Sequence, residues 1–155
     1  MKYTNRRSLA AMATAALTMS GTIGLTAGSA QAGDAWNISE WDSWGQPCGT
    51  YLCLYYYPGL WGASWRPAHY NDKDLSGNKF YDSGYFGSDG AGLIVEDNAA
   101  SAGNRTTNCW LYIWPYRNMM GYGNRLAPRH AGDFTEGGLY HLRNNASSVQ
   151  MLECK

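Results

Sequence analysis

The sequence carries one pattern twice: an aromatic run that ends in glycine, followed dozens of residues later by a cluster of Asp or Asn with Ala and Ser. The two copies span residues 53–62 with 97–101, and residues 109–121 with 144–148. In each copy an aromatic residue precedes a glycine by seven positions, Tyr55 before Gly62 and Trp114 before Gly121. This spacing suits a strand that turns sharply where glycine tolerates a positive φ. The duplication predicts an all-β domain built from two Greek-key units.

Residues 1–32 have the composition of a secretory signal peptide. A basic start at Lys2, Arg6 and Arg7 is followed by an apolar, small-residue stretch, and Ala-Gln-Ala at 30–32 offers a cleavage site. A transmembrane anchor is the alternative, but the stretch is rich in Ala, Thr, Ser and Gly and lacks stop-transfer charges. We therefore expect a secreted, extracellular protein, exported by the general route rather than by a twin-arginine signal.

The charge of the predicted mature chain, residues 33–155, restricts its partners. Removing the leader takes three of the twelve Lys and Arg residues and none of the twelve Asp and Glu, which leaves a net charge near −3. Nucleic acid and anionic membranes attract basic surfaces. We therefore expect neither as a partner, and no membrane association after cleavage.

Four cysteines, Cys48, Cys53, Cys109 and Cys154, all lie after the leader. An even number in an exported protein favours disulfides over free thiols or a metal site. Three pairings are possible. The favoured one closes the short loop from Cys48 to Cys53 and ties Cys109 to the C-terminus at Cys154. Zinc binding would need two close cysteine pairs, which the spacing does not provide.

Several aromatic or β-branched runs predict strands. They lie at residues 51–57, 93–95, 109–114, 139–142 and 149–152. No segment of useful length has the apolar period of a helix. Residues 71–92 and 123–138 are rich in turn-forming residues and predict long connections. The first unit is longer than the second, and we expect its extra chain to carry binding specificity.

The opening Cys48-x4-Cys53-Leu-Tyr, the glycine after the aromatic strand and the recurring Asx-Asx-x-Ala-Ser clusters resemble the secreted bacterial peptidase inhibitor family I36. The resemblance covers residues 48–154. It implies a βγ-crystallin-like sandwich with disulfides in a domain at residues 48–155. The family and its relatives include inhibitors of secreted metallopeptidases, calcium-binding crystallin modules, small antifungal proteins and adaptor subunits of secreted umbrella-type toxin complexes. Their common property is binding without catalysis.

The Asx clusters raise the question of a calcium site. In βγ-crystallin modules, the pattern Asx-Asx-x-x-Ser/Thr-Ser supplies oxygen ligands to Ca²⁺. The candidate ligands are Asp97, Asn98 and Ser101 in the first cluster, and Asn144, Asn145 and Ser147 in the second. The first cluster has Ala102 in place of the final Ser, and aligning Ser147-Ser148 on the pattern puts Arg143 at the first Asx position. The alternative is that these residues form turns by bonding their own backbone, and we expect no obligatory cofactor.

No arrangement of catalytic residues is visible in the sequence. The histidines His69, His130 and His141 are scattered, and there is no His-x-x-x-His pair and no Gly-x-Ser-x-Gly elbow. The acidic residues of the first connection, Asp72, Asp74, Asp82 and Asp89, lie in a Gly-rich segment where solvated loops are ordinary. We expect a non-enzymatic protein.

A tryptophan-rich segment at residues 33–47 precedes the predicted domain and contains Trp36, Trp41 and Trp44. One interpretation is an extended N-terminal arm whose indoles insert into a groove on a secreted partner protein. The other is an extra strand or staple that folds back over the domain. The first predicts docking onto a peptidase or a catalytically dead protease-like subunit, as inhibitor or as adaptor.

Aromatic residues within the domain offer a second kind of binding. Tyr55, Tyr56 and Tyr57 with Trp61 and Trp65 have the flat faces that stack on sugars. Side chains on a strand alternate between its two faces, however, so about half of them must point into the core. The alternative function is therefore a calcium- or glycan-binding protein of the cell wall, or an antifungal protein.

Overall fold

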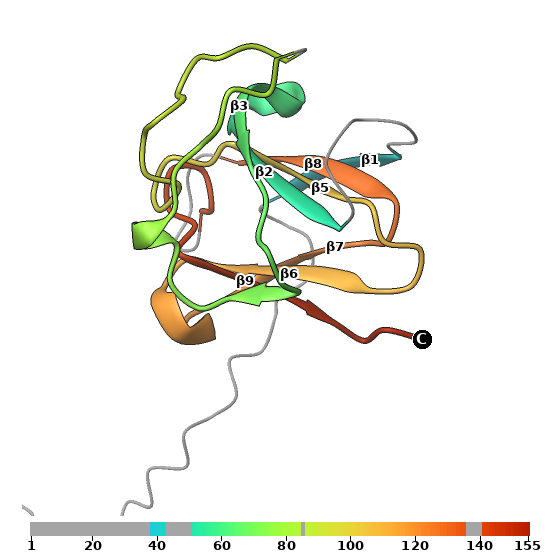
Figure 1. Cartoon of the computed structure of the whole chain (residues 1–155). Coiled ribbons are helices and arrows are strands. Elements are labelled where there is room, and N and C mark those ends of the chain that lie inside the picture. The colour runs from blue at the N-terminus through green and yellow to red at the C-terminus, as the bar shows by residue number, and fades with distance from the viewer. Residues whose placement is uncertain (1–37, 43–50, 85, 136–140) are drawn as a thin grey trace, which may run out of the picture.

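The computed structural model describes residues 38–42, 51–84, 86–135 and 141–155, which form two antiparallel sheets packed face to face (Figure 1). The strands are β1 (Ile38–Asp42), β2 (Leu52–Tyr57), β3 (Trp61–Trp65), β4 (Asn71–Asp72), β5 (Ser101–Asn104), β6 (Trp110–Trp114), β7 (Asn124–Leu126), β8 (His130–Phe134) and β9 (Ser148–Leu152). Three short 3₁₀ turns accompany them: η1 (Pro58–Leu60), η2 (Leu75–Gly77) and η3 (Arg117–Met119). Within the described ranges, no helix is long and apolar enough to cross a membrane.

The strand order shows the predicted duplication. Sheet A has the order β1-β8-β5-β2-β3 and sheet B has the order β4-β9-β6-β7. If β2 to β5 form the first unit and β6 to β9 the second, each sheet holds the second, first and fourth strands of one unit and the third strand of the other. The prediction of a duplicated Greek-key, crystallin-like sandwich is therefore confirmed. The N-terminal strand β1 extends sheet A beyond β8.

The hydrophobic core lies between the sheets and follows the alternation of the strands. Inward positions include Leu52 and Leu54 of β2, Leu111 and Ile113 of β6, and Val149 of β9, each at most 1% exposed. A second, smaller cluster covers the other face of sheet A and contains Cys53, Tyr55, Leu60, Phe86 and Ala131. Sheet A is therefore buried on both faces around Tyr55.

Three of the predicted strands are confirmed, as β2, β6 and β9. The predicted strand at 93–95 is wrong, because Leu93 and Ile94 are 47% and 46% exposed and Ile94 makes only an isolated bridge with Lys79. Half of the predicted strand at 139–142 falls outside the described residues, and its last two residues, His141 and Leu142, are not in a strand. The sequence did not predict β3, β4, β5, β7 or β8. Of these, β4 lies at the start of the predicted connection 71–92, and β7 and β8 lie within the predicted connection 123–138.

Candidate functional site

The turn between β2 and β3 is held by one buried serine. Ser101 Oγ donates to the carbonyl of Tyr57 at 2.7 Å and accepts from the backbone N–H of Leu60 at 3.2 Å. Gly59 and Leu60 have positive φ values of 69° and 63°. The hydroxyl thus satisfies backbone groups in a turn that makes few bonds of its own.

The second unit repeats this arrangement. Ser148 Oγ donates to the carbonyl of Tyr116 at 2.7 Å and accepts from the backbone N–H of Met119 at 3.1 Å. Asn118 and Met119 have positive φ values of 57° and 58°. Gly121 has a φ of 86°, and its counterpart in the first unit also has a positive value, as the seven-residue spacing predicted.

These bonds correct the alignment of the two Asx clusters. Ser101 is equivalent to Ser148, as the repeat implies, whereas the calcium pattern had paired it with Ser147. Asp97 is then equivalent to Asn144, and both residues have positive φ, 57° and 54°. As aligned on the calcium pattern, the two clusters were therefore offset by one residue, and Ser101 and Ser148 are the buried serines that hold the turns.

The two Asx clusters lie side by side. The N–H of Asp97 donates to the carbonyl of Ala146 at 3.1 Å, and the N–H of Asn144 donates to the carbonyl of Ala99 at 3.0 Å. Equivalent residues thus make equivalent bonds in both directions, as a pseudo-twofold axis requires. The candidate calcium residues of both units are brought to one end of the molecule.

Most of the polar side chains in these clusters bond to nearby backbone. The Asn98 amide donates to the carbonyl of Glu96 at 3.1 Å, and the Asn145 amide donates to the carbonyl of His141 at 2.9 Å. Ser147 Oγ lies 3.4 Å from Asp97 Oδ1. These are the bonds expected of the turn-forming alternative.

The sequence analysis did not anticipate the role of Arg117, which brings a cation to the same end of the molecule. Its guanidinium forms a two-pronged bond with Glu96, at 2.7 and 2.6 Å, and lies 3.2 Å from Asp74 Oδ1. Arg117 holds the pKa of Glu96 below its ordinary value, whereas partial burial and the charge of Glu96 raise the pKa of Asp97. In the described part of the chain, no group of three His, Cys, Asp or Glu residues could hold a metal ion. Calcium binding stays a prediction, and a guanidinium is the cation seen beside these carboxylates.

Exposed aromatic side chains gather at the turn of the first unit. We call Tyr57 and Trp61, which face each other across the turn and are 43% and 56% exposed, the first tip. The Trp61 ring packs edge-on against Phe86, with ring centroids 6.1 Å apart. Tyr55 and Trp65 are buried, so the sugar-stacking platform proposed from the sequence does not exist as a whole.

The equivalent positions of the second unit are also exposed. Tyr116 and Met120, which we call the second tip, form a bridge across their turn and are 60% and 58% exposed. The two tips share a backbone and differ in their side chains. Of the two tips, only the first has two aromatic rings, and a third ring, that of Phe86, packs beneath it.

The N-terminal segment forms a strand over part of its length. All five residues of β1 pair antiparallel with β8, and Trp41 lies opposite Ala131. Residues 38–42 therefore adopt the extra strand that the second interpretation expected. Trp36 and Trp44 lie outside the described residues, and binding of a partner by the three tryptophans stays a prediction.

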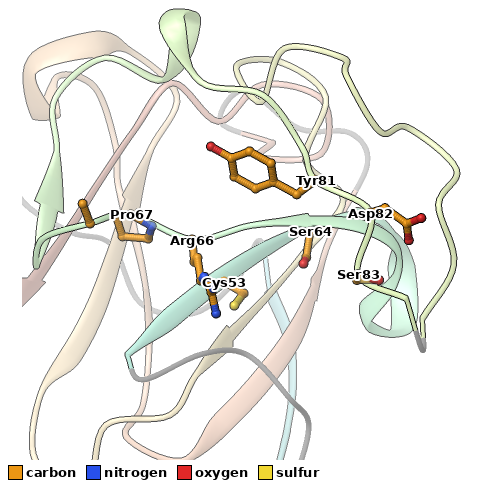
Figure 2. Close-up of a pocket in the computed structure, with 8 residues that line it drawn as sticks. Cys53, Ser64, Arg66, Pro67, Tyr81, Asp82 and Ser83 are labelled. Carbon is orange, nitrogen blue, oxygen red and sulfur yellow. The ribbon is translucent and has the colours of Figure 1, made fainter.

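A pocket of about 600 Å³ opens beside β3 (Figure 2). It is lined by Cys53, Ser64, Arg66, Pro67, Ala68, Tyr81, Asp82 and Ser83. Figure 2 shows Arg66 next to Cys53, with Asp82 and Ser83 farther along the pocket. The sequence analysis did not anticipate this pocket, because its two walls come from separate segments.

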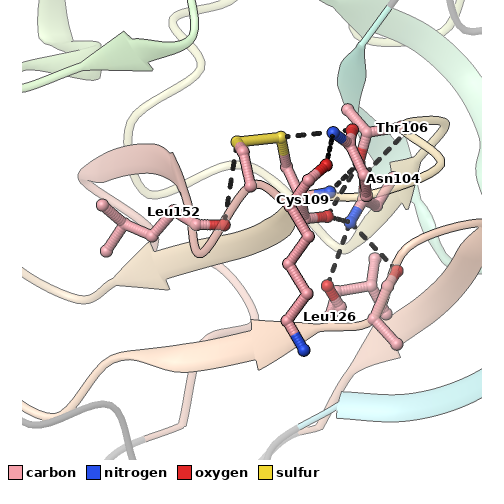
Figure 3. Close-up of a disulfide and its surroundings, with 9 residues drawn as sticks. Asn104, Thr106, Cys109, Leu126 and Leu152 are labelled. Carbon is pink, nitrogen blue, oxygen red and sulfur yellow. Dashed lines mark hydrogen bonds between the residues drawn. A yellow bond between two sulfur atoms is a disulfide. The ribbon is translucent and has the colours of Figure 1, made fainter.

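The predicted disulfide between Cys109 and Cys154 is confirmed (Figure 3). Beside it, the amide of Asn104 donates to the carbonyls of Cys109 and Leu126 at 2.9 and 3.1 Å, and its oxygen accepts from Thr106 Oγ1 at 2.7 Å. The disulfide and this buried amide together fix the connection between the two units. Cys53 is also disulfide-bonded, and its predicted partner Cys48 lies outside the described residues.

Comparisons with known proteins add little to this geometry. No family model matches the sequence, and no curated protein matches it. A solved structure described as "Evolution of the eye lens beta-gamma-crystallin domain fold" is similar, with 17% identity and a TM-score of 0.49. The match covers 76% of this chain and 99% of that chain. The strand order carries the fold assignment, and the resemblance to the peptidase-inhibitor family rests on the sequence motifs.

Proposed function

We propose that the protein is a secreted, non-enzymatic module that binds another secreted protein. The Cys109–Cys154 disulfide is typical of proteins that work outside the cytoplasm. The two tips expose aromatic or apolar side chains, and hydrogen-bonded turns hold them on a sandwich with a buried core. A sandwich of this kind presents its exposed side chains in a fixed arrangement, which suits the binding of another protein.

The observation that carries the proposal is the first tip. A Trp that is 56% exposed leaves a large apolar surface in water, and Trp and Tyr are favoured anchors of protein interfaces. Trp61 is also held in place, because it packs on Phe86 and its neighbour Gly62 donates its N–H to the carbonyl of Phe86 at 2.7 Å. A preorganised anchor loses little conformational entropy on binding.

The partner we propose is a protease-fold protein, either an active peptidase or a catalytically dead subunit of a secreted antibacterial toxin complex. The sequence motifs support this choice, since relatives of the peptidase-inhibitor family act on such proteins. Trp36 and Trp44, which flank β1 in the sequence, remain candidate contacts beside the first tip.

Affinity capture from the native culture supernatant, followed by mass spectrometry, tests the proposal. The tagged mature protein should recover a protease-fold partner, and Trp61→Ala should lose it. Met120→Ala, which alters the equivalent position of the second tip, is the matched control and should retain it. Equal recovery by both variants would move the interface away from the first tip.

A second pair of variants tests the N-terminal tryptophans. Deleting residues 33–47 would remove β1 from sheet A, so point substitutions are the cleaner design. Trp36→Ala with Trp44→Ala should weaken capture without lowering the melting temperature. A large fall in melting temperature would instead make these residues part of the folded core.

Inhibition assays separate the two versions of this function. An inhibitor should lower the activity of the captured peptidase in proportion to the amount added. An adaptor should leave every protease activity of the supernatant unchanged while it co-purifies with a large assembly. Capture of neither kind of partner would contradict the proposal.

A further inference from the structure

The pocket beside β3 lies on the outer face of sheet A. Ser64 and Tyr81 form a two-way backbone bridge, with N···O distances of 3.0 and 2.8 Å, so their side chains emerge on the same face. Leu54 pairs with Trp65, which makes Cys53 and Arg66 the next opposite positions. The floor therefore comes from β2 and β3, and the wall comes from residues 81–83 of the long connection.

The wall is fixed by hydrogen bonds within the connection. Ser83 Oγ donates to the carbonyls of Gly62 and Gly87 at 2.9 and 3.0 Å. One carboxylate oxygen of Asp82 accepts from the N–H of Gly84 at 2.8 Å. Among the described residues, no hydrogen bond occupies the second oxygen of Asp82 or the hydroxyl of Ser64, so both can bond a ligand. The pocket is thus formed before anything binds.

Arg66 is the cation of the pocket. Among the residues that the structure describes, its guanidinium has no ion pair and no hydrogen bond, in contrast to the doubly paired Arg117. A planar guanidinium binds a carboxylate through two parallel hydrogen bonds. Arg66 lines the pocket, so its guanidinium can offer such a bond to a ligand there.

Tyr81 supplies an apolar face at the rim. It is 61% exposed, and its neighbour along the chain is the acceptor Asp82. A flat ring beside hydroxyl donors and acceptors suits a sugar, whose ring has an apolar face and polar edges. Asp82 lies toward the other end of the pocket from Arg66 (Figure 2), so a bound sugar would meet a cation at one edge and an acceptor at the other.

We propose that this pocket binds a carboxylate-bearing sugar unit of an acidic polysaccharide. Arg66 would pair with the carboxylate, Tyr81 would cover the sugar ring, and Asp82 and Ser64 would bond its hydroxyls. One guanidinium and one carboxylate in the same pocket match a monoanion better than a phosphate, which carries more charge near pH 7. This site is separate from the first tip and does not rest on the proposed protein partner.

The test is a titration of the ¹⁵N-labelled mature protein with trigalacturonate, beside a neutral galactose trisaccharide. The acidic sugar should shift amide resonances of residues 64–66 and 81–83, and the neutral sugar should bind at least roughly tenfold more weakly. Binding should weaken as salt is raised, since the Arg66 side chain is exposed. Equal binding of both sugars, or no binding of trigalacturonate, would overturn the proposal.

Two matched pairs of variants locate the contacts. Arg66→Gln should weaken binding roughly tenfold or more, while Lys73→Gln, which removes an exposed charge outside the pocket, should not. Tyr81→Ala should weaken binding and Tyr81→Phe should retain it, because the ring is kept. Equal affinity of the Arg66 and Lys73 variants would overturn the assignment.

A carboxylate could also come from the C-terminus of a peptide. The same titration with a short, otherwise neutral peptide that ends in a free carboxylate distinguishes this ligand from an acidic sugar. Shifts at residues 64–66 and 81–83 with the peptide, and none with trigalacturonate, would replace a sugar site by a peptide site. Unchanged amide spectra of the variants outside the pocket would show that each is folded.

Discussion

The two Greek-key units share a backbone and differ in the chain that covers them. Each has a serine-held turn, a positive-φ residue in its Asx cluster and a strand that joins the opposite sheet. Between the third and fourth strands, however, the first unit runs from 73 to 100 and the second only from 135 to 147. The longer connection pairs with the edge of β3, where Ala63 donates its N–H to the carbonyl of Asp89 at 2.8 Å.

That difference shows how a duplicated frame acquires distinct surfaces. The longer connection provides Phe86, which supports Trp61, and residues 81–83, which wall the pocket. Both proposed binding regions therefore depend on the same added chain. The following predictions test this dependence and the equivalence of the two frames.

The largest effect is expected for Phe86→Ala. Phe86 is 6% exposed and packs edge-on against both Tyr55 and Trp61, at 6.2 and 6.1 Å. Its truncation should lower the free energy of unfolding by about 3–5 kcal/mol, which urea denaturation with an unchanged m-value would show. Ile94→Ala, in an exposed part of the same connection, should cost only about 0.5 kcal/mol. Similar losses for both variants would mean that Phe86 does not support the tip.

A smaller, matched effect is expected for the two turn serines. Ser101→Ala and Ser148→Ala each leave a backbone carbonyl and N–H without a partner, so each should cost about 1–3 kcal/mol in thermal unfolding experiments. Ser147→Ala removes a long bond to the Asp97 carboxylate and leaves no buried backbone group without its partner, so it should cost less than about 1 kcal/mol. A greater loss for Ser147→Ala than for Ser148→Ala would restore the alignment suggested by the calcium pattern.

Asp97→Asn, which gives the first unit the residue type of Asn144, should raise stability by less than about 1 kcal/mol at pH 7. Burial and Glu96 raise the pKa of Asp97, so the charged carboxylate costs stability above that pKa. The gain should fade as the pH falls from the raised pKa to the ordinary one, because Asp97 is then protonated in both the folded and the unfolded chain. Melting temperatures from pH 3 to 8 would show this, and a gain that persists at low pH would point to the backbone preference of Asn instead.

The smallest expected effect is that of calcium. The guanidinium of Arg117 already pairs with Glu96 and Asp74 and repels a second cation, so millimolar Ca²⁺ should leave the melting temperature unchanged. Arg117→Gln should lower the melting temperature and make it respond to Ca²⁺. A rise with Ca²⁺ in the unaltered protein, scaling by mass action, would establish a calcium site.

The duplication could be predicted because glycine spacing and aromatic runs report directly on local backbone geometry. The strand β5 could not, since its Ser-Ala-Gly-Asn sequence has little intrinsic preference for a strand. It becomes a strand because it lies between β2 and β8, where small side chains fit. Leu93 and Ile94 show the opposite case to β5. Both residue types favour strands, but they lie among turns that leave their side chains exposed, and no strand forms.

The site was harder to predict than the fold. Adjacent Ser147 and Ser148 fit the sequence pattern equally well, and only the bond to Tyr116 shows which one holds the turn. The pocket needs the pairing of Ser64 with Tyr81, which no local pattern encodes. The pairing of Cys109 with Cys154 was accessible from sequence, because few alternatives exist for four cysteines.

The exchange of third strands has a consequence for how the chain folds. β4 completes sheet B beside β9, so Asn71 pairs with Gln150, a residue far from it in the sequence. Contacts of such large sequence separation slow folding, because the closure entropy is lost before the pairing is gained. A chain cut within residues 105–109 would yield halves whose sheets each end in an unpaired edge, and such edges recruit other strands. The two units repeat one strand order, yet each sheet needs a strand from the other unit, so the molecule should fold in a single cooperative step.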